Sequence, residues 1–205
     1  MSEVATVDGT RLRHDWPLPD PSDADSKHDR GSITVIGGSA STPGAVLLAG
    51  LAALRAGAGR LTIATAASTS SALAVAVPEA AVVGLLESTA GALDESAVAD
   101  AASASEDAQA VLIGPGLQEP DGARDFVDAL LAKLPGGATL VVDALAITCG
   151  SDDAIRSWGS RGQVIVTPND TEAQRLLGDS AANRSDADIA AMVAAHLGAV
   201  TVLGS

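Results

Sequence analysis

The chain has 205 residues, of which 47% are apolar, so it is long enough and apolar enough to bury one full core. Aromatic residues make up only 1%, and we therefore expect a core built from Ala, Val, Leu and Ile. The formal net charge is −14, which argues against nucleic acid and anionic membrane as partners. Adaptation to high salt is the favoured explanation of this acidity, and an acidic face for a basic partner is the alternative.

Neither a disulfide framework nor a membrane anchor is indicated. Cys149 is the one cysteine, which excludes an intramolecular disulfide and fits a reducing compartment. Residues 1–30 are polar and rich in Pro and Asp, unlike a signal peptide. The longest apolar run, residues 45–54, is too short to span a bilayer. We therefore expect a soluble, cytoplasmic protein with no membrane partner.

The chain order predicts an amino-terminal arm followed by one domain. Residues 1–29 show no periodicity, so we expect residues 1–30 to form an extended arm that leads into a domain over residues 31–205. From there, β-rich and helical segments alternate. In the first half we predict strands at 32–36, 60–65, 81–86 and 110–113, and helices at 43–58, 69–77 and 94–105.

The same alternation continues in the second half. We predict strands at 138–142, 163–166 and 199–203, and helices at 121–134, 152–158, 171–177 and 185–197. Continuous apolar strands that alternate with helices predict an α/β fold, with a mostly parallel sheet covered by helices on both faces.

The last predicted strand is followed directly by Gly204-Ser205. A doubly wound domain would normally place a helix there, although an edge strand can also end such a fold. We therefore expect the domain to be incomplete at its C-terminal end. An open apolar edge invites association, so we also expect a homo-oligomer.

The unusual residues lie directly after predicted strands. Gly37-Gly38-Ser39 and Gly114-Pro115-Gly116 follow two strands, Asp143 follows a third, and Thr167-Pro168-Asn169 follows a fourth. The carboxyl ends of parallel strands meet at one edge of a sheet, where open α/β sheets bind ligands. The four turns therefore predict one shared pocket.

The two glycine turns each allow two interpretations. Residues 37–45 lead into a predicted helix and could hold a pyrophosphate, because glycines permit close approach and a helix start offers free N–H groups. The alternative is a tight turn with a Ser/Thr cap; the loop is neither a Walker A nor a Gly-x-Gly-x-x-Gly motif. The turn at residues 114–116 presents backbone N–H groups in a fixed array, or simply connects two elements.

The polar residues after the later strands also allow more than one interpretation. Asp143 could orient a metal-bound water or a ribose hydroxyl, or it could be a helix N-cap or a strand-end turn residue. Asn169 could donate to a substrate amide, or it could cap the following helix. Glu172 stands three residues later, which favours a capping box. The three histidines are not spaced as a metal pair, so the metal ligands stay unknown.

Taken in order, these segments resemble the ADP/ATP-dependent NAD(P)H-hydrate dehydratases of the ribokinase-like superfamily. The resemblance runs from about residue 28 to residue 203, and the similar stretches are 31–39, 44–45, 54–59, 78–79, 111–117, 142–144, 166–168, Glu172 and 176–177. It implies a ribokinase-like fold and a repair reaction in which hydrated NADH or NADPH loses water, driven by cleavage of ADP or ATP, usually with Mg²⁺.

The resemblance also implies where ligands lie. The family's hydrate-bordering positions correspond to Ala45, Gly116 and Asn169. Together with the loop chemistry, the candidate substrate-binding residues are Gly38, Ser39, Gly44, Ala45, Gly114, Gly116, Asp143 and Asn169.

Several positions depart from the family pattern. Asn169 replaces its His, and Leu145 replaces its second carboxylate. The family's Gly-Ser-Gly-Asp segment, which carries the expected base, would lie beyond residue 205. We therefore assign no catalytic residue and expect little turnover from this chain alone. A non-catalytic nucleotide-binding paralogue and a small-molecule kinase of the superfamily are the alternatives.

Overall fold

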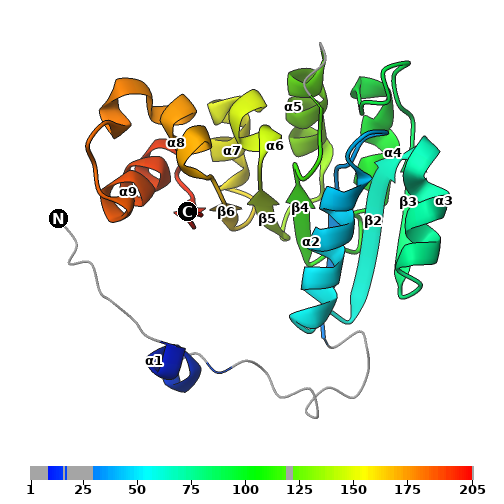
Figure 1. Cartoon of the computed structure of the whole chain (residues 1–205), viewed down its shortest axis with the longest axis horizontal. Helices are drawn as coiled ribbons and strands as arrows, with labels where there is room; N and C mark the ends of the chain where they lie inside the picture. Colours follow the sequence, from blue (N-terminus) through cyan, green and yellow to red (C-terminus); the bar gives the residue numbers. More distant parts are fainter. Residues whose placement is uncertain (1–8, 16, 18–29, 119–121, 205) are drawn as a thin grey trace.

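The structure is a computed structural model, and it describes residues 9–15, 17, 30–118 and 122–204. A seven-stranded sheet forms its centre, in the order β3-β2-β1-β4-β5-β6-β7, and each neighbouring pair is parallel (Figure 1). The strands are β1 (Ser32–Ile36), β2 (Arg60–Ala66), β3 (Ala80–Leu85), β4 (Ala110–Ile113), β5 (Thr139–Val142), β6 (Val164–Val166) and β7 (Val200–Thr201). The predicted α/β fold with a parallel sheet is confirmed.

The helices alternate with these strands. They are α1 (Gly9–Asp15), α2 (Pro43–Arg55), α3 (Ala67–Ala76), α4 (Val98–Ser103), α5 (Ala123–Lys133), α6 (Leu145–Cys149), α7 (Asp152–Trp158), α8 (Asp170–Leu177) and α9 (Asp186–Leu197), with 3-10 turns η2 (Glu95–Ala97) and η3 (Gly178–Ala181). Among the described residues, no helix has the length and hydropathy needed to cross a membrane.

Four sequence predictions need correction. The arm is not wholly extended, because α1 forms a short helix in which Arg11 pairs with Asp15 four residues on, at 3.2 Å. The helix predicted at 94–105 is divided, since Asp94 caps the separate turn η2 by accepting from the Ser96 N–H. The five-residue helix α6 was not predicted, and β7 is shorter than the predicted strand at 199–203.

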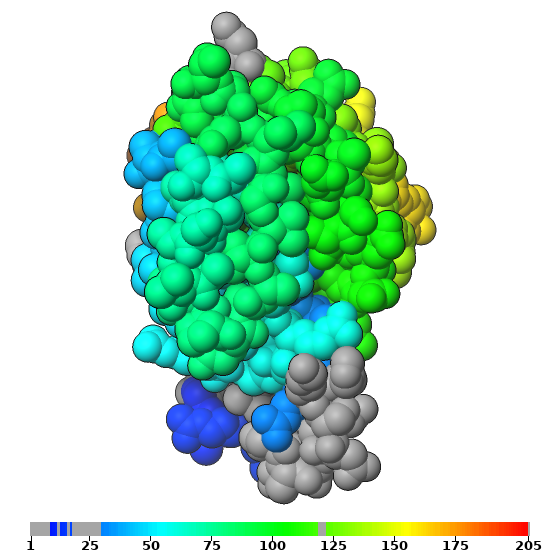
Figure 2. Space-filling view, turned by 90° about the vertical axis from the view of Figure 1, so that its right-hand side faces the viewer, coloured from blue at the N-terminus to red at the C-terminus, as the bar shows by residue number. Residues whose placement is uncertain are grey.

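Helices cover both faces of the sheet, as predicted. On one face, Val35, Leu61 and Ile63 of β1 and β2 pack against Val46 of α2 and Leu73 of α3. The opposite face carries α4 to α9 and a larger apolar cluster. Figure 2 looks at the β3 end of the sheet and shows the chain around α3 beside the chain around α4.

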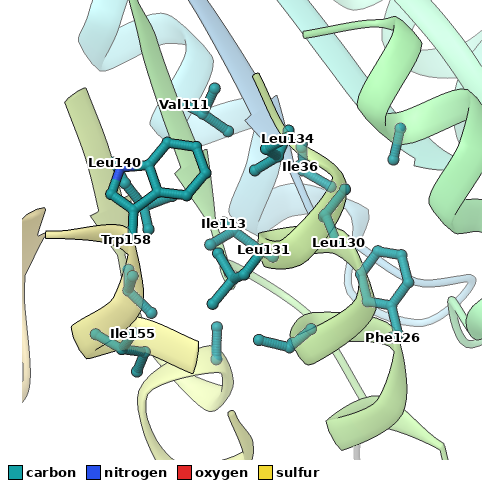
Figure 3. Close-up of a cluster of buried hydrophobic side chains, with 14 of the residues drawn as sticks. Ile36, Val111, Ile113, Phe126, Leu130, Leu131, Leu134, Leu140, Ile155 and Trp158 are labelled. Atoms are coloured by element: carbon teal, nitrogen blue, oxygen red, sulfur yellow. The ribbon is translucent and has the colours of Figure 1, made fainter. Parts of the chain in front are cut away.

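The larger cluster is mostly aliphatic, as the composition predicts. Its two aromatic members, Phe126 of α5 and Trp158 of α7, are fully buried among Leu and Ile side chains (Figure 3). The guanidinium of Arg161 lies 4.4 Å from the centre of the Trp158 ring. This packing fixes α5 and α7 against the strands whose ends carry the candidate residues.

The β7 edge of the sheet exposes two valines. Val200 is 50% exposed and Val202 55% exposed, although both belong to an apolar segment of the sequence.

Candidate functional site

The path of the chain across the sheet reverses between β1 and β4. From β1 the chain proceeds to β2 and β3 at one edge, whereas β4 to β7 proceed toward the other edge. Adjacent loops diverge at such a switch point, and the crevice between them is where open α/β sheets bind ligands. The two turns that leave this point are the predicted glycine turns, residues 37–39 and 114–116.

The two glycine turns contact each other through their backbones. The Gly38 N–H donates to the Pro115 carbonyl at 2.7 Å, and the Thr42 hydroxyl donates to the Gly116 carbonyl at 2.7 Å. Gly116 has φ +72°, and a Cβ there would lie 2.6 Å from the Thr42 carbonyl oxygen. The approach therefore requires glycine, and the two turns form a single unit.

The start of α2 has no capping side chain. Thr42 is the N-cap residue but makes no side-chain cap hydrogen bond, because its hydroxyl faces the second turn and the Ser39 hydroxyl, 2.6 Å away. Pro43 occupies the start of the helix, followed by Gly44 and Ala45. The predicted Ser/Thr cap is thus not formed, and the first-turn N–H groups keep the geometry that favours an anion.

A buried hydroxyl lies beneath this unit. Thr65, near the end of β2, is 0% exposed, and among the described residues its Oγ1 has no hydrogen-bond partner. A Cβ placed on Gly38 would lie 2.5 Å from that oxygen. Thr65 was not predicted as a site residue, because nothing in its local sequence distinguishes it from an ordinary strand threonine.

Asp143 joins the third turn to its neighbours. Its N–H donates to the Ile113 carbonyl at 2.9 Å, and its Oδ1 accepts from the Thr167 hydroxyl at 2.6 Å. A Cβ on Gly114 would lie 1.8 Å from the Asp143 carbonyl oxygen, so these two turns are also in direct contact. The prediction that four separate turns gather at one rim is therefore confirmed, and we call them the rim turns.

Asp143 does not cap a helix, which excludes the N-cap interpretation but not a strand-end turn. The N-cap of α6 is Ala144, with φ 49° and ψ −130°. A residue other than glycine in this region carries about 1–3 kcal/mol of strain, and such residues cluster at ligand sites. The carboxylate of Asp143 is therefore held by a hydroxyl and not by a helix start.

Asn169 caps α8, as the spacing of Glu172 predicted. Its Oδ1 accepts from the Glu172 N–H at 3.0 Å, and the Glu172 carboxylate accepts from the Asn169 N–H at 2.9 Å. This capping box uses the oxygen of the Asn169 amide and leaves its Nδ2 group as a donor at the rim.

The rim offers little to a metal ion on its own. Within the part of the chain that the structure describes, no three His, Cys, Asp or Glu side chains converge as metal ligands. Mg²⁺ in nucleotide sites is commonly held by one or two carboxylates together with phosphate oxygens and water. Asp143 could supply one such carboxylate.

A polar cleft adjoins the rim turns. It has a volume of about 320 Å³ and is lined by Leu117, Leu145, Thr148, Glu172 and Arg175. We call it the α6–α8 cleft. Thr148 and Arg175 were not predicted as site residues. The position of Arg175 one turn after the capping box is the signal that could have indicated it.

A model of the NAD(P)H-hydrate dehydratase family matches residues 33–205, which is most of the chain. The chain belongs to the NAD(P)H-hydrate dehydratase family. It is 38% identical over 203 residues to the ADP-dependent (S)-NAD(P)H-hydrate dehydratase of Xanthomonas campestris, covering 98% of this chain and 66% of that enzyme. The family resemblance of the sequence is thus confirmed.

Solved structures agree with this membership. A ribokinase-like superfamily protein of Enterococcus faecalis superposes with a TM-score of 0.71 at 28% identity, covering 92% of this chain and 62% of that one. The ADP/ATP-dependent NAD(P)H-hydrate dehydratase of Bacillus subtilis, co-crystallised with ATP and Mg²⁺, gives a TM-score of 0.69 at 28% identity, covering 96% and 65%. The ribokinase-like fold is therefore confirmed, and this family member spans about two thirds of the length of these relatives.

Proposed function

We propose that this chain serves in nicotinamide nucleotide repair, as part of an ADP- or ATP-dependent hydro-lyase. In this reaction the hydrated ring of NADH or NADPH loses water, and the reduced nicotinamide is restored. The relatives named for this reaction support the proposal. Mg²⁺ dependence, the cytoplasmic compartment and self-association stay predictions from the sequence.

One structural observation carries the proposal. The two glycine turns meet at the switch point of the sheet, beside an α2 start whose first N–H groups have no side-chain cap. Such a site suits an anionic ligand that approaches the backbone closely, as a nucleotide does. Gly38, Ser39, Gly44, Ala45, Gly114 and Gly116 would surround that ligand from one side.

The other rim turns would contact the ligand through side chains. Asp143, held by Thr167, would accept from a ribose hydroxyl or assist a nucleotide-bound Mg²⁺. The Nδ2 of Asn169, which the capping box does not use, would donate to a carbonyl of the nicotinamide amide. These roles require only that the rim stays rigid, which the contacts between its turns provide.

The test compares two Gly→Ala variants at opposite edges of the sheet. A Cβ on Gly44 meets no atom within 4 Å, and one on Gly136 meets only ordinary contacts with Arg161 at 3.5 Å. Both variants should therefore fold normally. Gly44 lies at the α2 start, so Gly44→Ala should weaken binding of NADH hydrate about fivefold or more, whereas Gly136→Ala should bind like the wild type.

Isothermal titration with NADH hydrate and with ADP measures binding, and recovery of the dihydronicotinamide absorbance measures dehydration. We expect the chain to bind both ligands. The proposal is wrong if the wild-type chain binds neither ligand, or if it phosphorylates a small alcohol from ATP while the hydrate stays unchanged.

A further inference from the structure

The α6–α8 cleft is continuous with the rim turns. Leu117 directly follows Gly116, and Leu145 stands two residues after Asp143. Glu172 is the capping partner of Asn169. A ligand that lies on the rim and extends past the β5 and β6 ends therefore enters this cleft.

The cleft is lined by one carboxylate and one guanidinium, and the two differ in their hydrogen-bond partners. The Glu172 carboxylate is engaged, because its Oε2 accepts from the Asn169 N–H at 2.9 Å. Arg175 lies one turn further along α8, and within the described part of the chain no carboxylate forms an ion pair with it. Arg175 is thus a cation that lines the polar cleft and forms no ion pair with a carboxylate of the described residues.

The start of α8 cannot take over this role. Its own capping box already satisfies N–H groups there, so an anion near α8 has to be recognised by a side chain. The fixed fork of guanidinium N–H groups matches phosphate oxygens in pairs, and Thr148 places a hydroxyl in the same cleft. In a chain of net charge −14, a local cation at the rim also offsets the repulsion of an anionic ligand.

We propose that Arg175, with Thr148 beside it, binds a phosphate group of the nucleotide ligand in the α6–α8 cleft. The proposal rests on the proposed function, because it takes the rim as a nucleotide site. The phosphate could belong to the nicotinamide dinucleotide or to the adenine nucleotide, and separate titrations distinguish these two sources.

The experiment titrates NADH, NADPH and ADP separately into the wild-type chain, Arg175→Gln and Arg184→Gln. Arg184 is an exposed arginine before α9 and does not line the cleft, so its variant makes the same change in net charge. We expect Arg175→Gln to raise the dissociation constant of at least one ligand about tenfold, and Arg184→Gln to change it less than twofold. The dissociation constant of Arg175→Lys should lie between those of the wild type and Arg175→Gln. Lysine keeps the positive charge but loses the paired N–H groups of the guanidinium.

Each outcome decides the proposal. If Arg175→Gln loses affinity for NADH and NADPH alone, the phosphate belongs to the dinucleotide. If it loses affinity for ADP alone, the phosphate belongs to the adenine nucleotide. Either result supports the subsite. Unchanged binding of all three ligands to Arg175→Gln, or an equal loss in Arg184→Gln, overturns the subsite alone. Failure of the wild-type chain to bind any of the three overturns the subsite together with the proposed function.

Discussion

The two halves of the rim are built in different ways. At the switch point, Gly38 and Gly116 bring backbone against backbone, and the α2 start keeps its N–H groups without a side-chain cap. At the β5 and β6 ends, Asp143 accepts from a side-chain hydroxyl and Asn169 closes the start of α8. The first half is therefore suited to receive an anion on its backbone, whereas in the second half the groups that would contact a ligand are side chains.

This difference predicts unequal tolerance to substitution. A backbone contact leaves no room for an added atom, so a change at the switch point should disturb the fold as well as binding. A side-chain contact can be removed with a limited local loss, since the backbone beneath it is held by the sheet.

Gly116→Ala should have the largest effect. The added Cβ would lie 2.6 Å from the Thr42 carbonyl oxygen, and the residue would keep φ +72°. We expect the free energy of unfolding to fall by about 3 kcal/mol, from the clash and the left-handed backbone together. Urea denaturation measures this loss. Gly136→Ala is the control, and a loss of less than about 1 kcal/mol in Gly116→Ala would show that the two turns can separate freely.

Thr167→Val should have a smaller effect in the other half of the rim. The substitution keeps the shape but removes the hydroxyl that donates to Asp143 at 2.6 Å. We expect the free energy of unfolding to fall by about 1–2 kcal/mol, which is typical of a charge-assisted hydrogen bond in a half-buried setting. Thr167→Ser keeps the donor and serves as the control; equal stability of Val and Ser at this position would mean that the bond contributes nothing.

Local sequence signals predicted the side-chain half well. The capping box depends on Asn169 and Glu172, which are three residues apart, so its geometry is set within one helical turn. The start of α9 was predicted in the same way, from Ser185 and Asp188. In the structure the Ser185 hydroxyl accepts from the Asp188 N–H and caps the helix. The alternation of strands and helices likewise placed all seven strands in order, with shifts of a few residues at their ends.

Long-range contacts explain what the sequence could not predict. From the local sequence, Thr42 is expected to cap a helix. In the structure its hydroxyl donates to the carbonyl of Gly116, 74 residues away, because the sheet places the two turns side by side. Arg175 and Leu117 meet in one cleft for the same reason. Helix α6 was not predicted because five residues are too few to show a helical period. It also follows the unusual backbone conformation of Ala144, which no residue type at that position indicates.

Ala144→Gly should have the smallest effect, and in the stabilising direction. Ala144 has φ 49° and ψ −130°, a conformation that glycine adopts without the penalty of a Cβ. Relief of about 1–3 kcal/mol of strain is opposed by about 0.5–1 kcal/mol from the greater freedom of glycine in the unfolded chain. From the middle of both ranges we expect a net gain of about 1 kcal/mol, seen as a melting temperature higher by about 2–4 °C.

Ala146→Gly is the matched control for Ala144→Gly, since Ala146 lies inside α6 and is fully buried. It should lose about 1 kcal/mol from helix propensity alone, in addition to the buried methyl group. A loss of the same size in Ala144→Gly would mean that the turn after Asp143 carries no strain. The side-chain half of the rim would then be held by ordinary local structure, and the contrast with the close backbone contact at Gly116 would be sharper still.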